Sequence, residues 1–334
     1  MKNIQPKSIL ISRTDSIGDV MLTLPICAWI KSKFPESKII FLGKNYTQPI
    51  INRYQCIDAF ENWDDYTSLS DDEKTKKMSA LNVDCIIHVF PNKEIARLAK
   101  KCKIVNRIGT SHRLFHLLTC NVRVNFTRKN SELHESQLNH ELLRPLGLEK
   151  IPSMEAINDT TVHFQKKQVD LPLKFNAIDN YVVLHPKSQG SAKEWPIEKY
   201  FQLAIELAQQ DYLVLFTGTE KEGLLFRDNI PQKDGIIDTT GQLTLDQLIK
   251  LIANAKGFVS CSTGPLHIAG YMGVQAIGLF SPKKPIHPGR WKSLGKHVNI
   301  LVSDEGCPAC KAGKDCYCIE DISIEKVLTA LLNK

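Results

Sequence analysis

Two series of alternating strand and helix patterns, one in each half of the chain, constrain its fold more than any other feature. Short apolar runs predict buried strands, and apolar residues at helical spacing predict amphipathic helices between them. In the first half the predicted strands are residues 8–12, 38–42, 84–89 and 103–108, and the predicted helices are 19–33, 71–80, 92–100 and 134–145. In the second half the predicted strands are 181–185, 212–216, 257–260 and 275–280, and the predicted helices are 197–209, 221–229, 245–253, 264–272 and 323–333. Alternation at this spacing favours βαβ units and mostly parallel sheets.

The length of the chain indicates more than one domain. Its 334 residues exceed the ~250–300 residues that one hydrophobic core usually serves. Segment 148–178 has no long period and is rich in Pro, Lys and Asp, which is typical of a connection between domains. We therefore predict an α/β fold with two Rossmann-like doubly wound domains, 1–168 and 169–322, that face each other across a cleft. We expect the C-terminal helix, 323–334, to pack back on the first domain.

Composition excludes several classes of protein. Hydrophobic residues make up 43% of the chain and charged residues 24%, as in ordinary globular proteins. No stretch approaches the ~18 uninterrupted apolar residues of a transmembrane helix. The N-terminus runs directly into the first predicted strand and lacks the apolar core of a signal peptide. We therefore expect a cytoplasmic protein.

The formal net charge of +7 is accompanied by clustered basic residues. The clusters contain Lys100, Lys101, Lys103, Arg107 and Arg113, then Arg123, Arg128 and Lys129. Such a patch suits an anionic partner, although a solvated face is an equally simple interpretation. No zinc-finger or aromatic RNA-binding signature accompanies the charge, so we expect no nucleic-acid partner.

Ten cysteines in a chain without a signal peptide favour thiols over a disulfide framework. Four of them are crowded near the C-terminus, namely Cys307, Cys310, Cys316 and Cys318. The first pair has the C-x-x-C spacing of metal ligands, whereas the second pair is closer than usual. A structural zinc site, packed reduced thiols and disulfides therefore all remain open.

Residues 13–25 follow the first predicted strand and open the first predicted helix. Parallel α/β sheets bind ligands at this carboxyl edge. Two carboxylates, Asp15 and Asp19, lie there and could take part in chemistry. The spacing of Ser16 and Asp19 also matches a capping box, which would make the motif structural.

Three loops of the second half also follow predicted strands and should gather at one edge of the sheet. Residues 185–196 carry hydroxyl and amine donors before a helix, and residues 217–222 carry two carboxylates. Residues 262–269 lead into a helix whose first N–H groups can bind a diphosphate. Neither G-x-G-x-x-G nor G-x-x-x-x-G-K-[ST] occurs, which disfavours an NAD enzyme and a P-loop NTPase.

Taken in order, these motifs resemble glycosyltransferase family 9, the ADP-heptose:lipopolysaccharide heptosyltransferases. The resemblance rests on Ser16-Ile17-Gly18-Asp19-Val20 with Leu24-Pro25, His185-Pro186, Lys193-x-Trp195-Pro196, Thr217-Gly218, Ser262-Thr263-Gly264-Pro265-x-His267, Gly278-Leu279-Phe280-Ser281-Pro282 and the late cysteines. It implies a GT-B architecture with an acceptor-binding first domain and a donor-binding second domain.

The resemblance also implies roles for individual residues. Asp19 matches the proposed catalytic base, Lys193 matches a lysine that contacts donor phosphate, and Glu220 or Glu222 matches an acid that faces the nucleoside. The donor-binding residues we expect are Ser188, Ser191, Lys193, Thr217, Gly218, Glu220, Glu222, Ser262, Thr263, Gly264, Pro265 and His267. The acceptor-binding residues we expect are Asp15, Ser16, Gly18, Arg107 and Arg113.

The implied activity is inverting, metal-independent transfer of heptose from ADP-heptose to a lipopolysaccharide core or a similar anionic glycan. The implied enzyme is a monomer that contacts the inner membrane surface peripherally and needs no cofactor for catalysis. Heptosyltransferases often carry Asp where this chain has Ser262, which leaves the donor sugar open. A transferase of a UDP-linked sugar and a non-catalytic nucleotide- or carbohydrate-binding protein are therefore alternatives.

Overall fold

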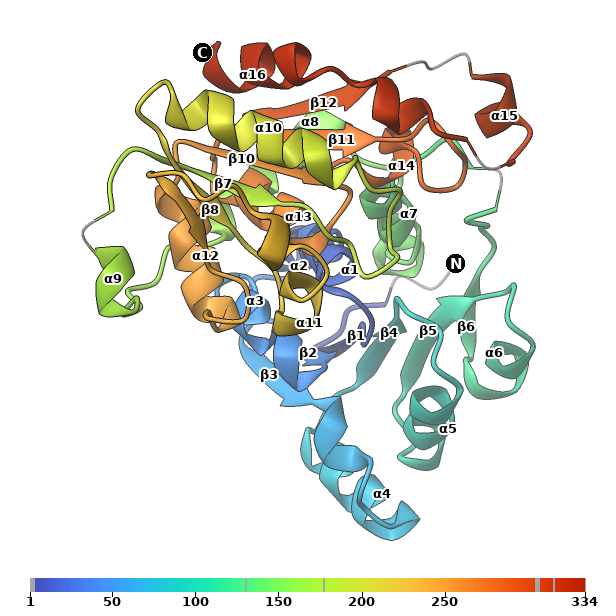
Figure 1. Cartoon of the computed structure of the whole chain (residues 1–334). Coiled ribbons are helices and arrows are strands. Elements are labelled where there is room, and N and C mark those ends of the chain that lie inside the picture. The colour runs from blue at the N-terminus through green and yellow to red at the C-terminus, as the bar shows by residue number, and fades with distance from the viewer. Residues whose placement is uncertain (1–3, 130, 177, 304–306, 315, 334) are drawn as a thin grey trace. The chain divides into compact units, whose positions relative to one another are not determined.

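Each half of the chain folds around its own six-stranded parallel sheet (Figure 1). The computed structural model describes residues 4–129, 131–176, 178–303, 307–314 and 316–333. Two compact units, Met1–Gln165 and Lys166–Lys334, divide the chain close to the domain boundary that we predicted.

The two sheets have the same topology. The strand order is β3-β2-β1-β4-β5-β6 in the first unit and β9-β8-β7-β10-β11-β12 in the second. The first sheet contains β1 (Ser8–Ser12), β2 (Lys38–Gly43), β3 (Ala59–Asn62), β4 (Cys85–His88), β5 (Asn106–Thr110) and β6 (Val122–Val124). The second contains β7 (Tyr181–His185), β8 (Leu213–Phe216), β9 (Ile236–Asp238), β10 (Gly257–Cys261), β11 (Ala276–Phe280) and β12 (Val298–Val302). This order is that of a doubly wound Rossmann-like sheet, so the predicted fold class is confirmed.

Helices connect the strands in both units. The first unit has α1 (Ile17–Met21), α2 (Leu24–Lys33), α3 (Gln48–Ile51), α4 (Asp71–Ala80), α5 (Lys93–Lys101), α6 (Leu114–Thr119), α7 (Glu135–Glu141) and α8 (Met154–Asp159). The second has α9 (Leu173–Asn176), α10 (Ile197–Ala208), α11 (Glu220–Gly223), α12 (Leu245–Asn254), α13 (Gly264–Tyr271), α14 (Pro288–Trp291), α15 (Pro308–Lys311) and α16 (Ile324–Leu332). Among the described residues, no helix is both long and apolar enough to span a bilayer.

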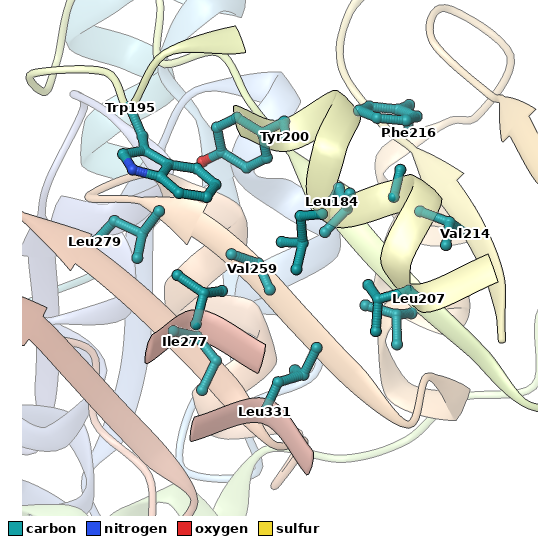
Figure 2. Packing of buried hydrophobic residues seen from close by; sticks show 14 of the residues in the cluster. Leu184, Trp195, Tyr200, Leu207, Val214, Phe216, Val259, Ile277, Leu279 and Leu331 are labelled. Carbon is teal, nitrogen blue, oxygen red and sulfur yellow. The ribbon is translucent and has the colours of Figure 1, made fainter. Parts of the chain in front are cut away.

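Buried central strands form the core of each unit. In the second unit, Leu184 and Val259 of the sheet pack with Trp195 and Tyr200, as Figure 2 shows. The indole N–H of Trp195 donates to the carbonyl of Ile322 at 3.0 Å, which ties the loop before α10 to the chain before α16. The core therefore fixes the loop that carries the predicted donor-binding residues.

The C-terminal helix packs on the core of the second unit. Val327 and Leu331 of α16 belong to the core cluster of the second unit, and α16 packs against α10 and β11. The helix is thus part of the second unit. Its apolar face matches the one that the sequence predicts, but its partner is the sheet that precedes it in the chain.

Three predicted helices are interrupted. The predicted helix 134–145 contains α7 and a 3₁₀ turn at Arg144–Leu146. The predicted helix 19–33 is two helices, α1 and α2, with a break at Leu22 and Thr23. The predicted helix 221–229 contains only the short α11 and a 3₁₀ turn at Arg227–Asn229. The sequence patterns also missed four strands, β3, β6, β9 and β12, and each of them is the edge of its sheet.

Candidate active site

The strand order of each sheet reverses between its first and fourth strands in the chain, β1 and β4 in the first unit and β7 and β10 in the second. Ligands of open α/β sheets bind at this switch point, beyond the carboxyl ends of the strands. The motif loops that follow β1, β7 and β10 begin at these ends. The fold therefore brings the predicted motifs to the expected place in each unit.

A buried arginine organises the loop after β1. Arg13 is only 3% exposed, and its Nε lies 2.7 Å from Asp15 Oδ1. Its guanidinium also pairs with Asp19 and lies 3.7 Å from Glu135 Oε1. Burial by itself disfavours the charged guanidinium, but the three carboxylates outweigh it and raise the pKa of Arg13 above its ordinary value. Arg13 thus stays charged and holds the two acids of the motif.

A second layer of polar contacts fixes this cluster. Glu135 is 1% exposed and accepts from Arg128 Nε at 2.8 Å. Arg128 also donates to the side chain of Asn139 at 2.9 Å, and Asn139 donates to the carbonyl of Leu22 at 3.1 Å. The start of α7 therefore supports the β1 loop, although the two segments are far apart in the sequence.

Asp19 accepts hydrogen bonds at both of its oxygens. Arg13 donates to Oδ1 and the hydroxyl of Ser16 donates to Oδ2. Ser16 is the N-cap residue of α1, but its side chain makes no capping hydrogen bond to the helix backbone. The capping-box alternative is therefore wrong, and the Ser16 hydroxyl serves to orient the carboxylate. Gly18, which lies between Ser16 and Asp19 in the sequence, is in the first turn of α1.

Asp15 lies in a less favourable environment for a charged carboxylate. Burial raises its pKa to about 6, the charge of Arg13 opposes this effect, and the nearby charge of Asp19 adds to it. The hydroxyl of Tyr46 donates to the carbonyl of Asp15 at 2.6 Å and holds the loop against the segment after β2. Asp15 is thus a group of the site that can change its protonation state near neutral pH.

The structure adds a residue that sequence patterns missed, His88 at the end of β4. It is paired in register with Ser12 and is 1% exposed. Neither of its ring nitrogens has a hydrogen-bond partner among the described residues, and burial lowers its pKa to about 3. His88 is therefore a neutral imidazole beside the switch point, and its place as the last residue of an apolar strand is the signal that could have found it.

Of the two predicted acceptor-binding arginines, Arg107 does not lie with the β1 loop. It is the second residue of β5, toward the amino end of the sheet, and its Nε donates to the carbonyl of Thr119 at 2.7 Å. Its guanidinium also donates to the carbonyl of Ile104. The side chain thus ties together backbone toward the amino end of the strand, and a role of Arg107 in acceptor binding stays a prediction. Arg113 is exposed just before α6, beyond the carboxyl end of β5.

In the second unit, neutral groups occupy the end of the first strand. His185 of β7 is 6% exposed, and its Nδ1 lies 3.0 Å from Thr217 Oγ1. Burial lowers the pKa of His185, although the charges of Glu222 and Glu194 oppose the shift. The pair connects the loop after β7 with the loop after β8. Gly218 follows Thr217 and is half-buried.

The loop after β7 is closed by Glu194. This carboxylate accepts from the backbone N–H and the hydroxyl of Ser188, both at 2.8 Å, and from Lys187 Nζ at 2.9 Å. Ser191 is exposed and donates to the carbonyl of Ser188 at 2.7 Å. Lys193 lies half-buried in the same loop. The hydroxyl of Ser188 is thus engaged within the loop, whereas Ser191 lies at its surface.

The two acids of the loop after β8 have different environments. Glu222 is buried and forms a capping box with Thr219, whose backbone N–H donates to it at 2.6 Å. Glu220 is exposed and forms a two-pronged ion pair with Arg227, at 2.7 and 2.9 Å. The capping role of Glu222 leaves Glu220 as the acid that a ligand could reach.

The loop after β10 leads directly into α13. Thr263 is the N-cap residue, and its side chain makes no capping hydrogen bond but lies 3.1 Å from the hydroxyl of Ser260. The helix starts with Gly264 and Pro265, and Ser262 is half-buried just before it. His267 is buried in the same helix. The N-terminus of α13 therefore has the character of an anion-binding site, with its first N–H groups not bound by the N-cap side chain.

The four late cysteines lie together. Their sulfur atoms all fall within 4.8 Å of one another, and all four are free thiols. Cys316 Sγ lies 3.3 Å from the sulfurs of both Cys307 and Cys310, and Cys310 Sγ lies 3.5 Å from that of Cys318. The backbone N–H of Cys318 donates to Cys316 Sγ and lowers the pKa of that thiol to about 7. Four converging sulfurs form a donor set that suits zinc or iron.

The chain is similar to known glycosyltransferases over nearly its whole length. The lipopolysaccharide heptosyltransferase 3 of Escherichia coli K12 is 26% identical and shares 79% of each chain. A family 9 glycosyl transferase from Veillonella parvula has a TM-score of 0.76 at 20% identity, covering 100% of this chain and 99% of that one. The E. coli ADP-heptose lipopolysaccharide heptosyltransferase II has a TM-score of 0.72 at 18% identity and covers 97% of each chain.

These structural relatives share the two Rossmann-like domains of the GT-B architecture, as the resemblance implied. The model of glycosyltransferase family 9 (heptosyltransferase) matches residues 75–318, which is well over half of the chain. In the second unit, the motif loops after β7 and β10 begin at the switch point of the sheet. In the first unit, Asp15 and Asp19 lie in the loop and helix that follow β1, at the switch point of that sheet. The protein is therefore a glycosyltransferase of family 9, the heptosyltransferase family.

Proposed function

We propose that this enzyme transfers a heptosyl group from ADP-heptose to the core of a lipopolysaccharide or a similar anionic glycan. The observation that carries the proposal is that the two units place different chemical groups at their switch points. The switch point of the first sheet presents carboxylates held by Arg13, whereas that of the second presents hydroxyls and a helix N-terminus. We assign the acceptor to the first unit and the donor to the second.

The donor diphosphate is assigned to the N-terminus of α13 and Lys193. Backbone N–H groups and the positive end of the helix dipole attract phosphate, and a lysine adds a mobile positive charge. Glu220 would accept hydrogen bonds from the nucleoside, because Glu220 is exposed whereas Glu222 is buried in its capping box. The name of the E. coli heptosyltransferase II supports ADP-heptose as the donor.

Asp19 is assigned the role of general base. Its carboxylate is oriented from two sides by Arg13 and Ser16, which suits a group that must meet one acceptor hydroxyl in a fixed geometry. The hydroxyl oxygen attacks the anomeric carbon, the bond to the diphosphate breaks on the opposite face, and the proton passes to Asp19. Negative charge then builds on the leaving diphosphate, where Lys193 and α13 stabilise it. This chemistry inverts the anomeric centre and can proceed without a divalent metal.

A transfer assay with defined donors tests the proposal. The purified enzyme is incubated with ADP-heptose, or with UDP- and GDP-linked sugars, and a heptose-deficient core oligosaccharide, and products are identified by mass and by NMR of the new anomeric centre. We expect one added heptose, with inversion, from ADP-heptose alone. Transfer from a UDP-linked sugar alone would show that Ser262 marks a different donor. Binding of nucleoside diphosphate without transfer from any donor would contradict an enzymatic role.

We also propose that the four late cysteines hold a structural metal ion. Their four sulfurs all lie within 4.8 Å of one another, and a four-thiolate set without an open position is typical of structural sites. The ion would fix the chain between β12 and α16. Metal analysis of enzyme purified without added metal should show about one zinc or iron per chain, and replacing Cys307 and Cys310 by Ser should abolish it. A metal content near zero would identify the cluster as packed thiols.

A lipopolysaccharide core is attached to lipid, so the proposed acceptor is presented at a membrane surface. We therefore propose that the enzyme works at the cytoplasmic face of the inner membrane, in peripheral contact with it. The chain carries no described helix that could span this membrane, so contact would depend on a surface of the folded protein.

A further inference from the structure

The positive charge of the protein is concentrated in one segment. Residues 93–123 contain eight Lys and Arg residues and a single acid, Glu94, which gives a net formal charge of +7. The whole chain has the same net charge, so the remaining residues are balanced. This segment forms α5, β5, α6 and the start of β6, which lie side by side at one edge of the first sheet (Figure 1).

Helix α6 in this segment has the reverse of the usual amphipathic pattern. His116 and Thr119 are buried, and His116 Nδ1 lies 3.0 Å from the carbonyl oxygen of Thr110. Leu114, Leu117 and Leu118 are 84%, 50% and 74% exposed. Their spacing of three and four residues places all three leucines on one face of the helix. The helix therefore buries polar side chains and presents leucines to its surroundings.

Basic residues border these leucines. On α5, Glu94 and Lys101 pair with Lys74 and Asp72 and so mark the face toward α4. Lys93, Arg97 and Lys100 follow the other side of the helix at spacings of four and three residues. Lys100 Nζ donates to the carbonyl of Leu118 at 2.8 Å, so this basic side of α5 faces α6.

More positive charge lies at the ends of α6. Arg113 is exposed at its start, and Arg123 is exposed just after it, on β6. We call the three leucines together with Lys93, Arg97, Lys100, Arg113 and Arg123 the α5–α6 face. An apolar patch with a basic rim is the chemistry that recognises an anionic lipid surface, since leucine side chains enter the interface while basic side chains meet headgroup phosphates.

We propose that the α5–α6 face docks the enzyme on an anionic lipid bilayer. The proposal deepens the membrane location given under the proposed function and rests on it for its biological setting, but its evidence is independent of the donor and of the reaction. Within this face, Lys100 lies at the end of α5, toward the amino end of β5, whereas Lys93 and Arg113 follow the carboxyl ends of β4 and β5. The three exposed leucines beside these basic residues favour a lipid surface over a soluble glycan as the partner of this face.

Sedimentation with vesicles tests the docking face without any substrate. The wild-type enzyme should bind vesicles of phosphatidylcholine and phosphatidylglycerol in a salt-sensitive way and bind pure phosphatidylcholine much more weakly. Lys93→Gln with Arg97→Gln should weaken binding to the anionic vesicles by about 30-fold. Leu114→Ser, Leu117→Ser and Leu118→Ser combined should weaken it by about tenfold or more.

Matched controls separate this face from general effects. Lys33→Gln with Lys38→Gln removes two exposed charges elsewhere on the first unit, and Val162→Ser with Leu173→Ser removes two exposed apolar side chains. Both controls should bind vesicles like the wild type. Because the substituted side chains are exposed, thermal unfolding should be nearly unchanged in every variant.

The outcomes distinguish the docking face from the proposed function. Variants that lose vesicle binding but transfer heptose to a soluble core oligosaccharide at the wild-type rate would support the docking face. Wild-type binding by the leucine and basic variants, or no binding by the wild type, would overturn it whether or not the enzyme transfers heptose. Loss of transfer to the soluble acceptor without loss of vesicle binding would instead assign the face to the acceptor site.

Discussion

The two sheets have the same strand order, but the ends of their first strands carry opposite kinds of chemistry. After β1, the buried Arg13 is surrounded by Asp15, Asp19 and Glu135. At the end of β7, the buried His185 is a neutral ring beside the hydroxyl of Thr217. A common topology therefore places a site without deciding what the site binds.

The difference fits the assignment that we propose, with the acceptor at the first unit and the donor at the second. An acceptor hydroxyl needs a proton acceptor with fixed orientation, and a buried guanidinium can hold carboxylates in place at the cost of burying charge. A diphosphate needs N–H and O–H donors with room to approach, which the loops before α10 and α13 provide. The first unit should therefore be sensitive to loss of charge, and the second to loss of individual donors.

The largest effect is expected at Asp19. Asp19→Asn keeps the size of the side chain and removes the proton acceptor, so kcat should fall by about 10²–10⁴-fold. Affinity for ADP should change little, because we assign the donor to the second unit. Steady-state kinetics and calorimetry measure the two quantities separately. An active Asp19→Asn enzyme with a lowered melting temperature would instead show that the carboxylate is structural.

Replacing Arg13 should cost the most stability. Arg13→Met leaves the 1% exposed Glu135 without one of its two cationic neighbours, and breaking such buried ion pairs costs about 3–5 kcal/mol. Urea unfolding measures the loss. The matched variant in the second unit is Arg227→Met, which breaks an exposed ion pair with Glu220 and should cost far less. Equal losses for the two variants would remove the contrast between the units.

Two lysines of one loop sharpen the assignment of the donor site. Lys193→Ala should weaken ADP binding by roughly tenfold or more and leave adenosine binding nearly unchanged, since a charge-assisted bond to phosphate is lost. Lys187→Ala should have a smaller effect, because Glu194 already binds the Lys187 ammonium group at 2.9 Å. Calorimetry with both ligands compares the variants. If Lys187→Ala proved the more damaging change, the phosphate contact would belong to Lys187.

The smallest effect concerns the protonation of Asp15. Its pKa of about 6 in the folded protein lies above the ordinary value for Asp, so the folded state holds this proton more tightly than the unfolded state does. Its contribution to stability is therefore present below pH 4 and is lost as the pH rises through 6. Asp15→Asn should remove this dependence.

The comparison of wild type and Asp15→Asn isolates that group from others that titrate in acid. From pH 5 to pH 7, the wild type should lose about 1 kcal/mol of unfolding free energy relative to the variant. Urea unfolding of both proteins at the two pH values measures the difference. A difference that is unchanged between pH 5 and pH 7 would mean that the pKa of Asp15 lies outside this range.

The strands show where sequence patterns were sufficient and where they were not. The central strands of both sheets, such as β1 and β7, are buried on both faces and appear as continuous apolar runs. All four edge strands were missed, because they are only partly buried and mix polar with apolar residues. An edge strand such as β9 is extended because β8 pairs with it, which a local pattern does not report.

By itself, the sequence determined the fold class, the order of the buried elements and the position of each motif loop after a strand. It could do so because burial periodicity and helix-start residues are local properties of the chain. Only the tertiary structure decided which of these side chains act together. Glu135 meets Arg13, Glu222 turns inward to cap α11, and α16 returns to its own sheet, because such contacts depend on how distant segments pack.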